Sequence, residues 1–225
     1  MILAAGRGER MRPLTDTTPK PMISIAGRSM LDRSMDRLTA RGVRTIVVNV
    51  HHLGEQIASH LDGRARIVRE DRLLETGGSV KNALPLLGAG PYFILNGDGL
   101  WRDGSQPMLS RMEAAWDPNR MDALLLLHPI EKAIGREAKD RGDYFLDADG
   151  RARHRSSAPS APYIFASVSI CESRLFRDSP DGPFSLLKLW TRAEAEGRLF
   201  GLVHDGDWFH IGTPQALADA ERRLA

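Results

Sequence analysis

The spacing of apolar residues along the first 130 positions predicts strands that alternate with helices. Residues 43–50 (VRTIVVNV) form a β-branched run that is typical of a strand buried on both faces of a sheet. Residues 29–41 place Leu31, Met35 and Leu38 at helical spacing and are followed by a glycine, which favours a helix that stops there. In the same way, strands are predicted at residues 1–5, 43–50, 65–69, 91–96 and 122–128, and helices at residues 29–41, 53–61, 77–87 and 105–116.

The pattern changes after Pro129. Residues 131–143 carry eight charged side chains in thirteen positions with little periodicity, which predicts a loop. Residues 144–155 predict a hairpin that turns at an Asp-Gly pair. The remaining predicted elements are strands at residues 162–170 and 198–204 and helices at residues 185–197 and 214–224, the last capped by Thr213.

This alternation favours a three-layer α/β/α sandwich with a mostly parallel sheet and right-handed crossovers. In such sheets, ligands bind beyond the carboxyl ends of the strands. Four loops rich in glycine or polar residues directly follow predicted strands, at residues 6–10, 49–52, 70–78 and 96–98. We therefore expect these four loops to converge on one rim of the sheet, although they are distant in sequence.

The loop after the first strand has the composition of an anion site. Gly6 and Gly8 lack a Cβ atom and allow positive φ angles. Backbone N–H groups in such a loop can point into one concavity and hold an anion. Four cations belong to the same segment: Arg7, Arg10, Arg12 and Lys20. Two X-Pro steps around Lys20 stiffen the exit of the loop. Phosphate is the ligand that this combination predicts.

Composition narrows the classes of function. The chain has 225 residues, 42% hydrophobic and 27% charged, which is ordinary for a globular domain with a sizeable core. Its formal charge of +2 gives no reason to expect a nucleic acid or a membrane as partner. No segment approaches the roughly 20 apolar residues of a membrane span. A single cysteine, Cys171, excludes an internal disulfide, and its apolar neighbours predict an inert core thiol. We expect a cytoplasmic protein. No pattern in the sequence indicates an oligomeric state.

The glycine loop differs from two common phosphate-binding motifs. It lacks the Gly-Lys-Ser/Thr of a P-loop, and Met11 stands where a dinucleotide fingerprint has its last glycine. The longer string G-x-G-x-R-x-x-P-L-T-x-x-x-P-K-P, from Gly6 to Pro21, resembles the signature of the sugar-1-phosphate nucleotidyltransferases. Residues 74–78 (LETGG) and 96–98 (NGD) add to this resemblance, which is strongest up to about residue 100. Within the family, the uridylyltransferases that act on N-acetylmuramate 1-phosphate are the most similar.

The resemblance implies a Rossmann-like sheet of the nucleotide-diphospho-sugar transferase type, with a small sugar-binding lobe. Residues 1–130 would form the nucleotide-binding part of a single domain. Residues 131–225 would form the sugar-binding part and complete the sheet.

The resemblance also implies roles for individual residues. Arg10 would bind the triphosphate, Lys20 would contact phosphate oxygens of the reacting groups, and Asp98 would be the first ligand of Mg²⁺, with Mn²⁺ as an alternative. These three are the expected catalytic residues. Asn96 is expected to bind the substrate through the sugar or the nucleotide, and Asp143 is expected to face the sugar. The expected nucleotide contacts are Ala5, Gly6, Gly8, Glu9, Arg10, Lys20, Glu70, Gly77 and Gly78. The last two glycines have an alternative role in tight packing of a helix on the sheet.

Residues 208–213 (WFHIGT) depart from the W-x-D-x-G-T of the family, in which the aspartate is the second metal ligand. His210 occupies that position. A neutral imidazole brings no negative charge and suits Zn²⁺ or Mn²⁺ better than Mg²⁺. Three arrangements remain open: His210 ligates the metal directly, it acts through a water molecule, or Asp205 or Asp207 replaces it. Our hypothesis is that His210 borders the metal.

Nucleotidyl transfer is the reaction that the resemblance implies. An oxygen of a sugar 1-phosphate attacks the α-phosphorus of a nucleoside triphosphate, and pyrophosphate leaves. The nucleophile is already an anion, so the protein must position two polyanions and neutralise the charge between them. UTP and N-acetylmuramate 1-phosphate are the favoured substrates, as in peptidoglycan recycling. The alternatives are a guanylyltransferase for mannose or heptose 1-phosphate, more distantly a choline-phosphate cytidylyltransferase, or a non-catalytic nucleotide-sugar sensor.

Overall fold

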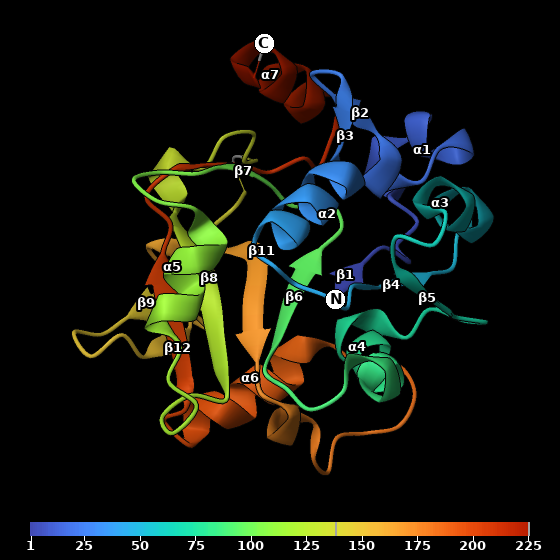
Figure 1. The fold of residues 1–225 in the computed structure, drawn as a ribbon. Helices are drawn as coiled ribbons and strands as arrows, with labels where there is room; N and C mark the ends of the chain where they lie inside the picture. Colours follow the sequence, from blue (N-terminus) through green and yellow to red (C-terminus); the bar gives the residue numbers. More distant parts are fainter. Residues whose placement is uncertain (138, 225) are drawn as a thin grey trace.

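The computed structural model describes residues 1–137 and 139–224, and shows a nine-stranded central sheet with helices on both faces (Figure 1). Its strands are β1 (Ile2–Leu3), β4 (Val47–Val50), β5 (Arg66–Arg69), β6 (Tyr92–Asn96), β8 (Ala123–Pro129), β9 (Tyr144–Leu146), β10 (Ala152–His154), β11 (Tyr163–Cys171) and β12 (Leu199–Val203). The main order is β10-β9-β11-β6-β1-β4-β5, with β8 paired to both β11 and β12.

Most strands of this sheet run in the same direction. β6, β1, β4 and β5 are parallel neighbours, and β12 is parallel to β8. β11 is antiparallel to β6, β8 and β9, so these three strands share one direction, and β10 is antiparallel to β9. Of the nine described strands, β10 and β11 therefore run against the other seven. The prediction of a mostly parallel sheet is confirmed.

Helices on the two faces bury alternate side chains of the same strands. One apolar core gathers Val48 and Leu124 with residues of α2 (Met30–Ala40), α3 (Gly54–Leu61) and α5 (Met108–Ala115). The other gathers Val47 and Leu125 with residues of α4 (Glu75–Leu87) and α6 (Leu186–Ala195). Because successive side chains of a strand point to opposite faces, these cores lie on the two sides of the sheet. The three-layer α/β/α arrangement is confirmed.

Smaller elements lie outside the central sheet. The glycine-rich segment contains α1 (Leu14–Thr17) between two 3₁₀ turns at Glu9–Met11 and Lys20–Met22. Two short antiparallel sheets are separate from the central sheet. One is a hairpin of β2 (Ser24–Ile25) and β3 (Arg28–Ser29), and the other is a ribbon of β7 (Leu100–Arg102) and β13 (Asp207–Phe209). Further 3₁₀ turns cover Ile130–Lys132 and Ser173–Phe176. The last helix, α7 (Pro214–Leu224), begins where predicted, with the hydroxyl of Thr213 accepting from the Ala216 amide.

Differences from the predicted boundaries have local causes. The first strand ends at Leu3 because the next amide, that of Ala4, donates to the side chain of Asn49. The helix predicted from residue 105 begins only at Met108, after Pro107. Ala138, within the predicted charged loop, lies outside the described residues. None of the described helices is long and apolar enough to cross a membrane.

Cys171 is buried in β11, as predicted for a core thiol. Burial raises the pKa of its thiol to about 11, which keeps it protonated and unreactive at neutral pH.

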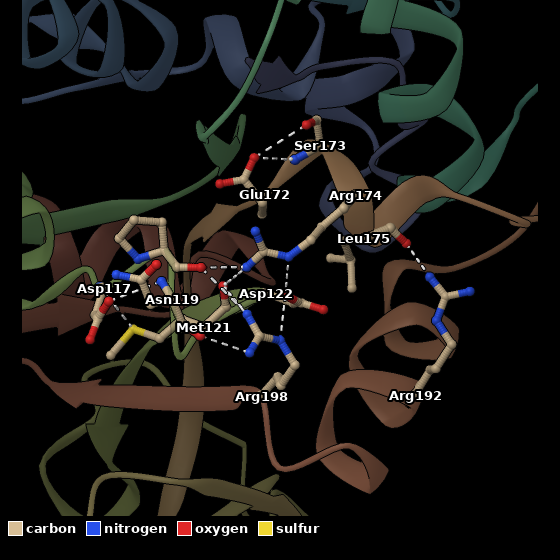
Figure 2. Close-up of polar contacts among 11 residues, drawn as sticks. Asp117, Asn119, Met121, Asp122, Glu172, Ser173, Arg174, Leu175, Arg192 and Arg198 are labelled. Carbon is tan, nitrogen blue, oxygen red and sulfur yellow. Dashed lines mark hydrogen bonds and ion pairs between the residues drawn. The ribbon is translucent and has the colours of Figure 1, made fainter.

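Asp122, Arg174 and Arg198 form a network of ion pairs (Figure 2). It lies at the amino-terminal end of β8, opposite the edge of the sheet at which β1 and β6 end. One carboxylate oxygen of Asp122 accepts from Nε of Arg174 and from Nε of Arg198, both at 2.7 Å. The Nη2 atoms of the same two guanidinium groups donate to the carbonyl oxygens of Pro118 and Met121. This network fixes the loop before β8 to the ends of β11 and α6.

Candidate active site

A cleft of about 600 Å³ opens at the carboxyl ends of β1, β4 and β6. Its walls come from all four loops that were predicted to converge, together with Gly212 near the C-terminus. The predicted site residues that line it are Ala5, Gly6, Gly8, Glu9, Arg10, Lys20, Glu70, Asn96 and Asp98. The convergence expected from strand order is therefore confirmed.

The glycine-rich loop is folded tightly against the segment that carries Lys20. Gly8 has a φ of 65°, and a Cβ atom there would stand 2.9 Å from Thr15 Cγ2 and 3.0 Å from Lys20 Cβ. The Thr15 hydroxyl donates to the Gly8 carbonyl at 2.9 Å. Only glycine fits both this conformation and this close approach. The loop and the lysine therefore form a single unit at the cleft wall.

Lys20 and Asp98 form an ion pair across the cleft wall. The lysine comes from the exit of the signature loop, and the aspartate from the turn that follows β6. The Lys20 side chain is 12% exposed and that of Asp98 is 37% exposed, so the carboxylate remains open to a ligand from the cleft. The pairing joins the cation and the carboxylate that the sequence singled out.

Glu70 and Asn49 form a buried polar network beneath the signature loop. The amide oxygen of Asn49 accepts from the Ala4 backbone at 3.0 Å, and its nitrogen donates to Glu70 Oε1 at 2.8 Å. The second oxygen of Glu70 accepts from the Leu74 amide at 3.2 Å. Both side chains are almost fully buried. The network joins the ends of β1, β4 and β5 into one floor.

Arg10 is held by a carboxylate from the charged loop. Its guanidinium lies 3.0 Å from Glu137, which also pairs with Lys139 at 2.8 Å. The pKa of Glu137 is lowered, first by the hydrogen bond from Lys139 and then by the charges of Lys139 and Arg10. The loop after β8 thus reaches the signature loop and places a carboxylate on the arginine expected to bind phosphate.

His210 lies at the rim of the cleft, next to the turn that carries Asp98. Phe209 of β13 pairs with Leu100 of β7, so the chain beyond this ribbon places His210 near the turn at residues 96–99, although His210 itself does not line the cleft. A Cβ atom on Gly212, which lines the cleft, would stand 2.8 Å from the His210 ring and 3.2 Å from Arg10.

The half-buried His210 ring is the neutral imidazole at physiological pH. Burial lowers its pKa, and the positive charges of Arg10 and Lys20 act in the same direction. The carboxylates of Asp140 and Asp98 oppose that shift. The ring of Trp208 meets it edge-on, with centroids 5.6 Å apart.

The two aspartates considered as replacements for His210 are engaged elsewhere. Asp205 accepts from the hydroxyl and amide of Ser105 and pairs with Arg111. Asp207 lies 3.6 Å from Arg102 on the ribbon.

Three other predicted residues are turned toward packing contacts. The amides of Gly77 and Gly78 both donate to the Phe184 carbonyl, and a Cβ atom on Gly77 would stand 2.4 Å from the Phe184 ring. Asp143 accepts from the Phe165 amide at 2.9 Å, where β11 has its irregularity. None of these three lines the cleft; Glu75, Thr76 and Ser79 of the same loop and helix do.

The donors at the rim fit a hard divalent cation held mainly by a phosphate ligand. Among residues 1–137 and 139–224, no three His, Cys, Asp or Glu side chains are grouped for a metal. Mg²⁺ needs only one or two protein carboxylates when phosphate oxygens complete its shell. Asp98, beside the glycine loop, meets this requirement, and it is close enough to His210 for its charge to act on that ring.

Sequence reasoning gave no individual role to three residues that the structure brings to the site: Asn49, Glu75 and Glu137. Asn49 stood within a loop that was expected to converge, so its position was available as a signal. The contact of Glu137 with Arg10 joins residues 127 positions apart. No periodicity reports a pairing at that separation.

Comparisons with known proteins agree with this geometry. The family model described as nucleotidyl transferase matches residues 1–134. An N-acetylmuramate alpha-1-phosphate uridylyltransferase of Caulobacter vibrioides is 45% identical, covering 100% of this chain and 96% of the relative. One of the same name from Neisseria meningitidis is 35% identical, over 98% and 96%.

Solved structures show the same fold at low sequence identity. A putative glucose-1-phosphate thymidylyltransferase from Bacillus anthracis matches with a TM-score of 0.79 and 17% identity, over 99% of this chain and 93% of that one. HddC from Yersinia pseudotuberculosis, complexed with GMP-PN, matches with a TM-score of 0.74 and 22% identity, over 100% and 98%. The family match and the full-length relatives identify this chain as a member of the nucleotidyl transferase family.

Proposed function

We propose that this sugar-1-phosphate nucleotidyltransferase uses UTP and N-acetylmuramate 1-phosphate, and produces the corresponding nucleotide sugar and pyrophosphate. The observation that carries the proposal is the ion pair of Lys20 and Asp98 at the rim of the glycine loop. This pair supports the proposal because it joins a cation that can bind phosphate to a carboxylate that would hold a metal ion. The choice of substrates is supported by two relatives with that activity in their names, 45% and 35% identical over nearly their whole length.

Different residues of the cleft position the two phosphate substrates and neutralise their negative charge. The amides of the glycine loop and Arg10 bind the triphosphate, and Lys20 binds phosphate oxygens of the reacting groups. The sugar 1-phosphate approaches from the side of Asn96, so that its oxygen attacks the α-phosphorus in line with the leaving pyrophosphate. No general base is needed because the attacking oxygen carries its own negative charge. Fixed cations around both polyanions lower the barrier.

Asp98 would hold Mg²⁺, or Mn²⁺, with His210 next to it. When bound, the ion neutralises negative charge on the phosphates. Asp98 would supply the carboxylate that holds the ion, and Lys20, which pairs with Asp98 in this structure, would supply an ammonium group for the phosphate oxygens. Neutral His210 stands where the family pattern has an aspartate, so this metal site has one negative charge fewer than a site with that aspartate. Mn²⁺, which accepts imidazole more readily, should therefore support activity at least as well as Mg²⁺.

The test is a screen of pyrophosphate release. Four nucleoside triphosphates are combined with the 1-phosphates of N-acetylmuramate, N-acetylglucosamine, glucose, mannose and a heptose, each with Mg²⁺ and with Mn²⁺. Release with UTP and N-acetylmuramate 1-phosphate alone is the expected result. Release only with GTP and mannose or heptose 1-phosphate would replace the proposed substrates. Tight binding of a nucleotide sugar without release in any combination would identify a non-catalytic sensor, the alternative raised by His210.

A further inference from the structure

Glu75 combines a strained backbone with a position on the cleft wall. It is the first residue of α4 and has a φ of 57°, in the left-handed region that non-glycine residues rarely adopt. The other described non-glycine residues with positive φ are Ala26, Leu53, Asp62, Ser156, Ser167 and Asp178, and none of them lines the cleft. Glycine would adopt the same conformation without strain. The chain nevertheless carries a charged side chain here.

The surrounding backbone is held firmly in place on both sides of Glu75. The Leu74 amide donates to Glu70, and the Leu74 carbonyl accepts from the Phe184 amide. On the other side, the hydroxyl of Thr76 accepts from the Leu186 amide at 2.9 Å. These contacts impose the left-handed conformation on whichever residue stands at position 75. A strained residue in such a frame is typical of a functional position.

The carboxylate of Glu75 is free to meet a ligand. The residue is exposed, and within residues 1–137 and 139–224 no hydrogen bond or ion pair engages its side chain. By contrast, both oxygens of its neighbour Glu70 are engaged by Asn49 and Leu74. Glu75 is therefore the carboxylate at this end of the cleft that retains its full capacity to accept hydrogen bonds.

The order of the strands gathers the cations that line the cleft at one end and leaves Glu70 and Glu75 without a lining cation at the other. Lys20 and Asp98 meet where β6 and β1 end, and the glycine loop follows β1. Glu70 and Glu75 follow β5, on the far side of β4. A polyanion belongs at the first end. The second end, with an exposed Leu73 beside two carboxylates, suits a neutral group that carries N–H or O–H donors.

We propose that Glu75 is a specificity-determining residue whose carboxylate accepts a hydrogen bond from a donor of the nucleoside. The donor is either the imino N–H of the base or a ribose hydroxyl, and both share this chemistry. The inference rests on the proposed function for the identity of the nucleoside, uridine. It explains why a carboxylate is present where the backbone would favour glycine.

The test is a cycle that combines variants of Glu75 with analogues of UTP. The value of kcat/KM is measured with UTP, 2′-deoxy-UTP, 3′-deoxy-UTP and N3-methyl-UTP for the wild type, Glu75→Gly and Glu75→Gln. Glu75→Gly should lower kcat/KM for UTP roughly 10- to 100-fold, as expected for a hydrogen bond to a charged group. It should have less than about a twofold effect on the one analogue that lacks the recognised donor.

The pattern of non-additivity decides the source of the donor. Loss of the Glu75→Gly effect with a deoxy analogue identifies a ribose hydroxyl, and loss with N3-methyl-UTP identifies the base. Equal effects of Glu75→Gly on UTP and on all three analogues would overturn the inference, as would an unchanged kcat/KM for UTP. Glu75→Gln keeps the size of the side chain and should give an intermediate loss with the same pattern.

A matched control separates recognition from relief of strain. Asp62 also has a positive φ, of 41°, and an exposed side chain, but it lies outside the cleft. Asp62→Gly should change kcat/KM less than about twofold, as for other surface substitutions. The affinity for UTP at equilibrium gives the same comparison without turnover. A wild type that binds UTP but releases no pyrophosphate would contradict the proposed function. The role of Glu75 would then be tested by comparing the affinities of the wild type and Glu75→Gly for UTP and its three analogues. A wild type that does not bind UTP would overturn both.

Discussion

Replacing Asn49 with alanine tests whether the floor of the cleft depends on one buried amide. The side chain of Asn49 is 2% exposed and joins the Ala4 amide to the Glu70 carboxylate, at 3.0 Å and 2.8 Å. Alanine would leave a buried N–H group without a partner and remove a hydrogen bond from a buried carboxylate. Each loss is worth about 1–3 kcal/mol. Together the two losses should lower the free energy of unfolding by about 2–6 kcal/mol.

The loss is measured as the free energy of unfolding by urea at pH 7, extrapolated linearly to water. The matched control is Asn82→Ala on the exposed side of α4, which should change it by less than about 0.5 kcal/mol. A loss below about 1 kcal/mol for Asn49→Ala would refute the reasoning.

The variant Asn49→Asp adds a signature that general destabilisation would not produce. It keeps an acceptor for the Ala4 amide but sets a carboxylate against Glu70. Two adjacent buried carboxylates raise the pKa of one of them in the folded state. The folded variant then binds more protons than the unfolded chain, so its stability should increase as the pH falls from 7 toward 5. Loss of stability over that range, relative to wild type, would contradict the assigned contact.

Three further predictions concern other contacts. Glu137→Gln should lower the KM for the nucleoside triphosphate roughly two- to fivefold, because it frees Arg10 from an exposed ion pair, and an increase in KM would contradict this. Asp122→Asn should lower the free energy of unfolding by about 2–3 kcal/mol without changing KM, since the two arginines that share this carboxylate lie at the opposite edge of the sheet. Burial lowers the pKa of His128 and of His204 below 6.5, so the unfolded chain binds more protons than the folded chain below pH 6.5. The free energy of unfolding should therefore decrease as the pH is lowered through this range. In His128→Gln, unfolding followed from pH 7 to 5 should show a shallower fall, and an unchanged slope would exclude His128 as a cause.

The predictions that depended on strand order and on local motif chemistry were the ones the sequence could support. The predicted strands at residues 43–50 and 122–128 correspond to the buried strands β4 (Val47–Val50) and β8 (Ala123–Pro129), the first being shorter than predicted. The convergence of four loops required only that parallel strands end at one edge. For this reason the sequence alone predicts that the signature loop and Asp98 lie at the same rim.

Other features depended on contacts that no local pattern encodes. The apolar run of β11 predicts a strand but not that it enters antiparallel between β6 and β8. The three-residue strands β7 and β13 are too short to show a period of two, yet their pairing places His210 near the turn that carries Asp98. The sequence left a packing role open for Gly77, but its packing partner Phe184 lies more than a hundred residues later, and no local pattern identifies that contact.

In the proposed reaction the enzyme transfers a uridylyl group, with Lys20 and Asp98 at the reacting phosphates. This reaction is tested most directly with UTP labelled at the α-phosphorus and N-acetylmuramate 1-phosphate, by following label into the nucleotide sugar. The wild type should transfer the label, and Lys20→Ala and Asp98→Ala should each lower kcat at least about 100-fold. Exposed Lys188→Ala, on α6, should match the wild type. Near-normal transfer by folded Lys20→Ala and Asp98→Ala would contradict the account.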